Sequence, residues 1–274
     1  MAQHSSKTNV LVTGAYGLIG NLVYQHLAAQ PDRYNVFGTS RRMQASSRAT
    51  KMDYNKISPE RLRLADLTDF DSVRRTVEGM DTIVHMAADA SGEAGWESVL
   101  QSNIIGAYNI FEASRQAGVK RVVFASSNQV VFGYLDKEFY RSVFAKENPK
   151  LTPDQIQRID HTRPTRPLNE YACSKVFGEA LAHMYAFTYG LSCIVLRIGW
   201  VLSDDTPPYP GAQMLWCSQR DCVQMVECCI NTTDDLRFDI FFVQSDNAYN
   251  IVDIQHAKNT LGYTPQDRAE DYLK

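Results

Sequence analysis

The sequence predicts an α/β fold in which a doubly wound parallel sheet carries a small C-terminal lobe. Short apolar, β-branched runs alternate with helix-type patterns along the chain, and a glycine-rich turn follows the first run. Polar residues come directly after several of the later runs. In a sheet of this kind, ligands bind at the carboxyl ends of the strands.

The length of 274 residues allows a large buried core, and we expect a single domain over residues 1–274. Apolar residues make up 44% and charged residues 22%, which is typical of a soluble globular protein. A net charge of -3 predicts neither nucleic acid nor an anionic membrane as the main partner. The chain begins without an apolar signal segment and has no apolar run of membrane length. We therefore expect a cytoplasmic protein without a membrane partner.

The cysteines all fall in the second half of the chain and form no CxxC pair. They occupy positions 173, 193, 217, 222, 228 and 229. The histidines are scattered and are not interleaved with the cysteines. This pattern favours buried free thiols over a disulfide or zinc framework, and we expect no metal site.

A strand, a glycine turn and a helix pattern open the chain. The apolar run Asn9–Thr13 ends at Gly14, Gly17 and Gly20, and a helix-type pattern follows. We expect Gly14 to make the tight turn, Gly17 to let the backbone approach a pyrophosphate, and Gly20 to pack helix on strand. A purely structural turn is the alternative, because the spacing is GxxGxxG and not GxGxxG. The dinucleotide contacts expected within this turn also include Tyr16, Leu18 and Ile19.

The second strand, 34–38, ends without the acidic residue that holds an NAD ribose. It is followed instead by Ser40, Arg41 and Arg42, which we interpret as a clamp for a 2′-phosphate. The pattern therefore favours NADP, with NAD possible. The alternative is a pair of solvated loop arginines.

Two further strand ends extend the expected cofactor site. The run 61–67 is expected to be a strand that ends in Asp66 and Leu67, with the acid within reach of an adenine. The strand 82–86 ends in Ala87 and Ala88, whose small side chains allow a cofactor to lie across the sheet edge. The remaining elements are expected as helices at 70–78, 97–116, 221–230 and 254–261, the last ended by Gly262, and as strands at 121–125, 191–198 and 238–243.

Tyr171 and Lys175 open a helix expected over 171–189, where their four-residue spacing places them on one face. A nearby ammonium favours the phenolate, so a group with a pKa near 10 can act as a base closer to neutral pH. Taken alone, the pattern also fits an exposed tyrosine and a solvated lysine.

The glycine turn, the strand-end Ser127 and the Tyr171-x-x-x-Lys175 pair occur in the order found in short-chain dehydrogenases/reductases, which the chain resembles. The Asp66-Leu67 and Ala87-Ala88 elements resemble the extended branch of that family. The resemblance implies a Rossmann-type domain, with a cofactor half at about 8–133 and a substrate lobe mainly at about 200–274. It also implies cofactor contacts from Asn103 and Ile198.

Several segments are similar to those of the compact sugar dehydrogenases of this branch, which include uronate dehydrogenase and the archaeal aldose and glucose-6-phosphate dehydrogenases. These segments are 124–128, 171–175, 197–199, 214–221 and 261–267. The resemblance implies NAD(P)-dependent oxidation of the anomeric hydroxyl of a sugar or sugar phosphate to its lactone. Tyr171 is then the base, Lys175 holds the nicotinamide ribose, and Ser127 orients the reacting oxygen.

The chain departs from uronate dehydrogenase at three places. Gln129 replaces a histidine, Trp200 replaces a serine, and the loop 209–216 lacks the arginine that holds a carboxylate. These differences favour a neutral sugar or a sugar phosphate over a uronate. The residues expected to contact the substrate are Ala90, Ser127, Asn128, Gln129, Tyr171, Trp200 and Gln213.

The segment 134–167 is long for a loop, and we expect either a substrate lid or a surface or subunit-contact insertion. Within it, 152–158 is a candidate short helix capped by Thr152. Arg197, at the end of a strand, could meet substrate or pair with a buried acid.

Two other functions remain open. A nucleotide-sugar epimerase or dehydratase shares the first half of the pattern, but only about 75 residues follow Arg197 to enclose a nucleotide diphosphate. A non-catalytic NADP-sensing protein would need the glycines but not Ser127, Tyr171 and Lys175. The resemblance also implies a homodimer formed through the helices at 97–116 and 171–189.

Overall fold

The computed structural model describes residues 7–46, 49, 56–91, 95–135, 141 and 152–273. Its centre is a seven-stranded sheet in the order β3-β2-β1-β4-β5-β6-β7, in which every neighbouring pair is parallel. The strands are β1 Thr8–Thr13, β2 Tyr34–Ser40, β3 Leu62–Leu64, β4 Thr82–His85, β5 Arg121–Ser127, β6 Ser192–Ile198 and β7 Phe238–Val243. The expected doubly wound α/β fold is confirmed.

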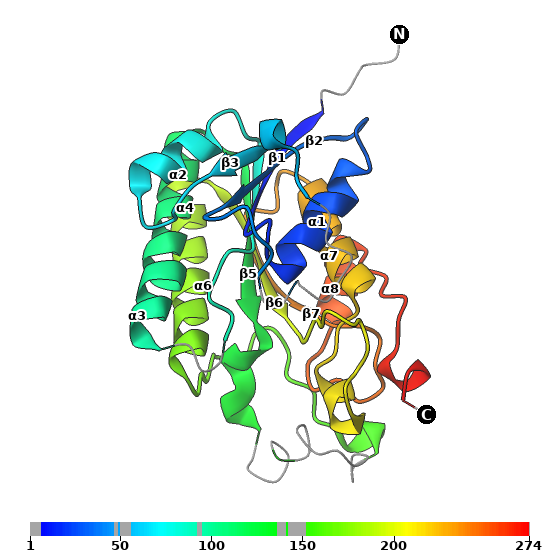
Figure 1. Cartoon of the computed structure of the whole chain (residues 1–274). Coiled ribbons are helices and arrows are strands. Elements are labelled where there is room, and N and C mark those ends of the chain that lie inside the picture. The colour runs from blue at the N-terminus through cyan, green and yellow to red at the C-terminus, as the bar shows by residue number, and fades with distance from the viewer. Residues whose placement is uncertain are drawn as a thin grey trace.

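Helices cover both faces of the sheet. Figure 1 shows α2, α4 and α6 on one side and α1, α7 and α8 on the other. The helices are α1 Leu18–Ala28, α2 Phe70–Val77, α3 Trp96–Val99, α4 Gly106–Gln116, α6 Glu170–Tyr189, α7 Gln219–Asn231 and α8 Gln255–Leu261. Each layer encloses its own apolar cluster against the sheet, and burial of apolar surface is the main stabilising term.

A third apolar cluster lies at the carboxyl ends of the strands, where the small lobe is expected. It joins Val130–Phe132, Ile159, Met214, Leu215 and the stretch Ile251–Ile254. Parts of the range expected for this lobe belong to the main layers instead: α7 packs beside α1, and β7 is the last strand of the sheet. The short segment carrying Ile159 is fixed to the lobe by a parallel bridge to Val252.

Several boundaries differ from those expected. The third strand is shorter, because only Leu62–Leu64 pairs with β2. The helix expected over 97–116 is interrupted by the π-helical segment Leu100–Ile105 between α3 and α4. The candidate helix at 152–158 is a single turn, Pro153–Gln155, where the Thr152 amide donates to the Gln155 side chain at 2.8 Å. Much of the expected lid, 136–140 and 142–151, lies outside the described residues.

Helix α6 packs closely on β5. The side chain of Asn169 caps its start by accepting from the Ala172 amide at 2.8 Å, and Gly190 ends it with a φ of 74°. A Cβ at Gly178 would lie 2.1 Å from the Phe124 ring, so only glycine allows this approach. The packing fixes the first turns of α6 against the end of β5.

A buried ion pair reinforces this contact and answers the question left open for Arg197. Its guanidinium donates to both carboxylate oxygens of Glu179 on α6, at 2.9 and 2.8 Å. Ser126 donates to the same carboxylate at 2.6 Å. Arg197 and Glu179 are 2% and 7% exposed in their side chains, and Arg197 lines neither of the cavities described below, so its role is structural.

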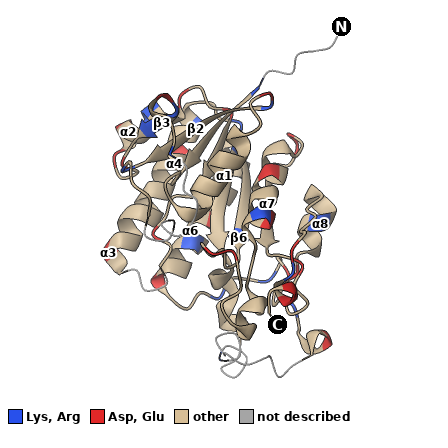
Figure 2. Ribbon diagram, turned by 45° about the vertical axis from the view of Figure 1, so that its right-hand side comes forward, with Lys and Arg blue, Asp and Glu red and all other residues tan. Residues whose placement is uncertain are grey.

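The charge distribution, the helix lengths and the cysteines can be compared with what the sequence predicted. Figure 2 shows acidic and basic residues mixed over the helices and loops. None of the described helices is long and apolar enough to cross a membrane. All six cysteines are free thiols, and Cys222 and Cys229 are buried in the core with Met225 and Val226, as expected from the helix pattern. The expectation of buried thiols is wrong for Cys173, which is exposed on α6, and Cys228 is only half-buried.

We predict that Glu179→Ala lowers the free energy of unfolding by about 3 kcal/mol, because it leaves the Arg197 guanidinium buried without its counter-charge. Urea unfolding followed by circular dichroism measures this change. Glu170→Ala, an exposed glutamate on the same helix, is the matched control and should change stability little. A loss below about 1 kcal/mol for Glu179→Ala would show that the pair does not hold α6 in place.

Candidate active site

The glycine turn brings the start of α1 to the carboxyl edge of the sheet. Gly14 has a φ of 65°, and a Cβ there would lie 2.9 Å from the Ala87 backbone. A Cβ on Gly20 would lie 2.2 Å from the Gly14 carbonyl oxygen, so Gly20 allows the helix to pack on the turn. Gly17 is the N-cap of α1, and its position leaves the helix amides facing the edge where an anion can bind.

A first cavity of about 270 Å³ extends from this turn along the ends of β1, β2 and β4. Ten of the residues expected to bind the cofactor line it: Gly14, Tyr16, Gly17, Ser40, Arg41, Arg42, Asp66, Leu67, Ala87 and Ala88. The sequence reasoning missed other residues of the wall, namely Thr39, Gln44, Ala45, Ser46, Ala65, Thr68 and Ser102. Most of these are immediate chain neighbours of predicted residues, which is the signal that could have found them.

The charged residues of the first cavity have different surroundings. Asp66 accepts from the Thr68 amide and hydroxyl, both at 2.9 Å. These hydrogen bonds, with Arg41 nearby, lower the pKa of Asp66 below its usual value and keep it ionised. Arg41 and Arg42 are exposed at the rim, where their charges can meet a phosphate.

Thr13 and His85 form a short polar chain behind the glycine turn. The Thr13 hydroxyl accepts from the Ala87 amide at 3.1 Å and lies 2.8 Å from the His85 Nδ1. Burial, with Lys175 adding to it, lowers the pKa of His85 to about 3, so this ring is neutral. The Thr13 hydroxyl can then donate to Nδ1 of His85, and these two hydrogen bonds hold Ala87 against Gly14. Neither polar contact was expected from the sequence.

A second cavity of about 580 Å³ shares Ala88 with the first and continues over β5 and β6. The expected cofactor residues Leu18, Ile19 and Ile198 line it, together with Ala90, Ser127, Gln129, Tyr171, Lys175 and Trp200. The walls that the sequence reasoning missed are Met86, Ala125, Ser126, Gly199, Val201, Leu202 and Ser203. The two cavities together follow the sheet edge from the glycine turn to α6.

Lys175 lies buried between α6 and β5. Its Nζ donates to the Ala125 carbonyl at 2.8 Å and lies 5.7 Å from the centre of the Tyr171 ring. Desolvation lowers the pKa of Lys175 to about 8, so at neutral pH most of it still carries its charge. The site therefore places a buried cation next to the phenol of Tyr171.

The two adjacent serines at the end of β5 have different partners. Ser126 is bound to Glu179, as described above. The Ser127 hydroxyl accepts from the Gln129 amide at 3.2 Å and remains in the wall of the second cavity. Gln129 in turn accepts from the side chain of Asn169, the cap of α6, at 2.9 Å.

Three expected contact residues lie elsewhere among the described residues. The amide of Asn103 donates to the Asp89 carbonyl at 3.0 Å and to the Ser174 hydroxyl at 3.0 Å, so it ties the π-helical segment to α6 and does not line either cavity. Asn128 and Gln213 are 1% and 4% exposed and also lie behind the cavity walls. In each case a polar side chain packs inward, which sequence position alone does not reveal.

The comparisons with known proteins agree with this geometry. A model of the NAD-dependent epimerase/dehydratase family matches residues 10–214. The NAD-dependent glucose-6-phosphate dehydrogenase of Haloferax volcanii is 33% identical over 96% of this chain and 95% of its own length. The uronate dehydrogenase of Pseudomonas putida is 32% identical over 96% of this chain and 85% of its own.

A comparison with solved structures also finds a sugar dehydrogenase. The crystal structure of uronate dehydrogenase from Agrobacterium tumefaciens has a TM-score of 0.76 and 29% identity, covering 97% of this chain and 87% of that one. The resemblance expected from the glycine turn, the strand-end serine and the tyrosine–lysine pair is therefore confirmed, and this chain belongs to the NAD-dependent epimerase/dehydratase family.

Proposed function

We propose that this chain is an NAD(P)-dependent sugar dehydrogenase that oxidises an anomeric hydroxyl to a lactone. One observation carries the proposal: Ser127, Tyr171 and Lys175 line one cavity, which shares the wall residue Ala88 with the cavity of the glycine turn. The relatives compared above are dehydrogenases of sugars, which supports the same reaction class here.

The residues present fit a nicotinamide dinucleotide, because the amides of α1, the two rim arginines and small strand-end residues lie along one path. When bound, the cofactor would accept a hydride from the sugar. Tyr171, as phenolate, would take the proton of the sugar hydroxyl, and the buried Lys175 charge favours that phenolate. Lys175 would also hold the nicotinamide ribose, and Ser127 would donate to the reacting oxygen.

The described wall of the substrate cavity supports a neutral sugar. Among its described residues Lys175 is the only cation, and it is already placed beside Tyr171. Gln129 and Trp200, which stand where uronate dehydrogenase is expected to have a histidine and a serine, both line the cavity. A uronate carboxylate would thus find no described arginine in this wall.

The alternative is a nucleotide-sugar epimerase or dehydratase, because such enzymes share the family. An epimerase returns its hydride to the substrate and releases no reduced cofactor, whereas a dehydrogenase releases one equivalent per turnover. A non-catalytic NADP sensor is less well supported, since it needs neither the buried Lys175 nor the tyrosine beside it.

We predict that the chain reduces NADP or NAD in the presence of a free or phosphorylated aldose. The panel would contain glucose, galactose, arabinose, xylose, glucose 6-phosphate, glucuronate and galacturonate, and the absorbance of the reduced nicotinamide would be followed. Tyr171→Phe should lower the rate by about a hundredfold or more while cofactor binding is kept. No reduction with any sugar, with cofactor binding shown, would support the nucleotide-sugar alternative instead.

The position of Ser40, Arg41 and Arg42 in the first cavity supports a preference for NADP. We predict that Arg41→Ala with Arg42→Ala raises KM for NADP by about tenfold and leaves KM for NAD nearly unchanged, because only NADP carries the 2′-phosphate. Steady-state kinetics with both cofactors measure the ratio of KM for NADP to KM for NAD. Arg33→Ala, at the opposite end of β2, is the matched control. An unchanged ratio would mean that the arginines do not contact the phosphate.

A homodimer through α4 and α6 is also proposed. Tyr108 on α4 and Phe187 and Tyr189 on α6 are large apolar side chains that are 47%, 58% and 51% exposed. Their burial against a second copy would remove apolar surface from water. Light scattering should report a dimer for the wild type and a monomer for Phe187→Glu. Leu168→Glu, at an exposed apolar residue outside both helices, should remain dimeric, and a monomeric wild type would contradict the proposal.

A further inference from the structure

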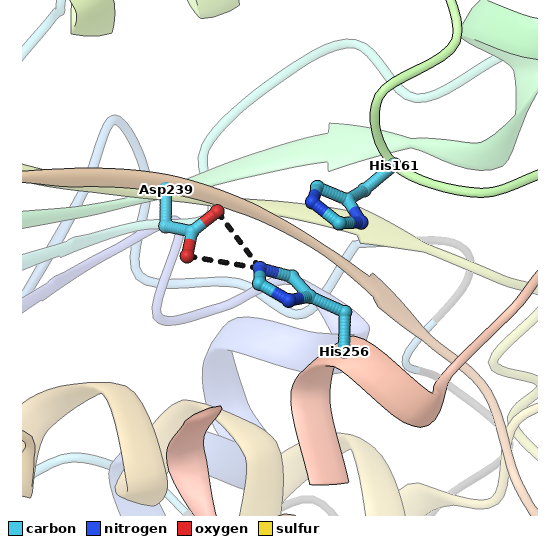
Figure 3. Close-up of side chains that lie close together, drawn as sticks. All are labelled: His161, Asp239 and His256. Atoms are coloured by element: carbon cyan, nitrogen blue, oxygen red, sulfur yellow. Dashed lines mark hydrogen bonds and ion pairs between the residues drawn. The ribbon is translucent and has the colours of Figure 1, made fainter. Parts of the chain in front are cut away.

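Three residues with metal-binding side chains meet at a place that neither cavity includes. His161 follows the bridge at Ile159, Asp239 belongs to β7, and His256 belongs to α8. One ligand atom from each lies within 4.8 Å of the others. Figure 3 shows both imidazoles beside the carboxylate, and His256 bonded to it.

His256 is held from several directions. Its Nε2 lies 3.0 and 2.9 Å from the two carboxylate oxygens of Asp239, and its Nδ1 lies 3.4 Å from the Thr260 hydroxyl. The ring of Phe241 stacks on it at 4.9 Å between centroids. A partner on Nδ1 leaves Nε2 as the nitrogen that can bind an ion, which is the arrangement found around histidine ligands of metals.

Asp239 and His161 are also positioned by their own surroundings. The Asp239 carboxylate accepts from the Ile240 amide at 2.7 Å, which orients it toward His256. The chain before His161 is fixed because the Ile159 amide donates to the Ile251 carbonyl, and the Asp253 amide donates to the Ile159 carbonyl, both at 2.9 Å. Each of the three segments is therefore positioned by contacts of its own.

The charge of the cluster suits a cation. It combines one carboxylate with two imidazoles, whose rings stack at 3.7 Å between centroids. A neutral imidazole is the form that binds a metal.

We propose that His161, Asp239 and His256 bind a divalent transition metal of the zinc type, with water completing the coordination. Two imidazoles and one carboxylate are a common three-ligand set for such ions. His161 has to turn about its side-chain bonds, because the two rings are now parallel and their nitrogen lone pairs do not converge. Asp239 and His256 keep side-chain exposures of 20% and 26%, which lets an ion enter from solvent.

The bound ion would be structural. It would join the segment that precedes α6 to β7 and α8, which are the last strand and the last α-helix among the described residues. Because α6 carries Tyr171 and Lys175, the ion would fix the approach of the chain to the catalytic helix. It would not take part in hydride transfer, since none of its ligands lines either cavity.

The test is metal binding by the full chain after treatment with a chelator. Calorimetric titration with Zn²⁺ should give one ion per chain, and Co²⁺ should give visible bands of a nitrogen–oxygen site. Since the ion binds the folded state, saturating Zn²⁺ should raise Tm by roughly 5 °C. His161→Gln, Asp239→Asn and His256→Gln should each weaken binding by about tenfold or more and reduce the shift in Tm.

His183→Gln is the matched control, because His183 is an exposed histidine outside the cluster. It should bind Zn²⁺ like the wild type, and circular dichroism should show that all four variants are folded. The proposal is overturned if the wild type binds no ion in the micromolar range. It is also overturned if the three cluster variants bind as well as the control, or if Co²⁺ shows a thiolate charge-transfer band, which would place the ion on a cysteine.

Discussion

The packing of α6 against β5 is the contact on which the site depends. The pair meets where Gly178 leaves room for the Phe124 ring, and it is reinforced by the buried Arg197–Glu179 ion pair. These contacts set the distance between the end of β5, which carries Ser127, and the first turns of α6, which carry Tyr171 and Lys175. A small shift of the helix would separate the proposed base from the residue that orients its substrate.

The buried Lys175 shows what this arrangement costs. Burial lowers its pKa from 10.5 to about 8, so below that pH the folded chain holds a charge that desolvation disfavours. The loss of stability is fully present below about pH 8 and disappears as the pH rises toward 10.5, the pKa of a solvated lysine. The hydrogen bond to the Ala125 carbonyl offsets part of it. A destabilising group kept at this place is typical of a functional site.

The order of the elements and most of the wall of the first cavity could be predicted because they depend on local patterns. Apolar runs, glycine turns and strand-end residues such as Ala87 and Asp66 are read directly along the chain, and the parallel sheet brings them to one edge. The side chains of Asn103, Asn128 and Gln213 are buried behind the cavity walls. This could not be predicted, since it depends on neighbours distant in sequence. The same reason hid the cluster of His161, Asp239 and His256, whose members are spread over nearly one hundred residues.

The most direct test of the account is the fate of the hydrogen on the anomeric carbon. A substrate aldose carrying deuterium at C1 would be oxidised, and the cofactor product analysed by mass spectrometry and NMR. The account predicts one deuterium at C4 of the reduced nicotinamide and a slower hydride-transfer step in single turnover. Deuterium that stays on the sugar after turnover would contradict oxidation at the anomeric carbon and favour an epimerase-type reaction at another position.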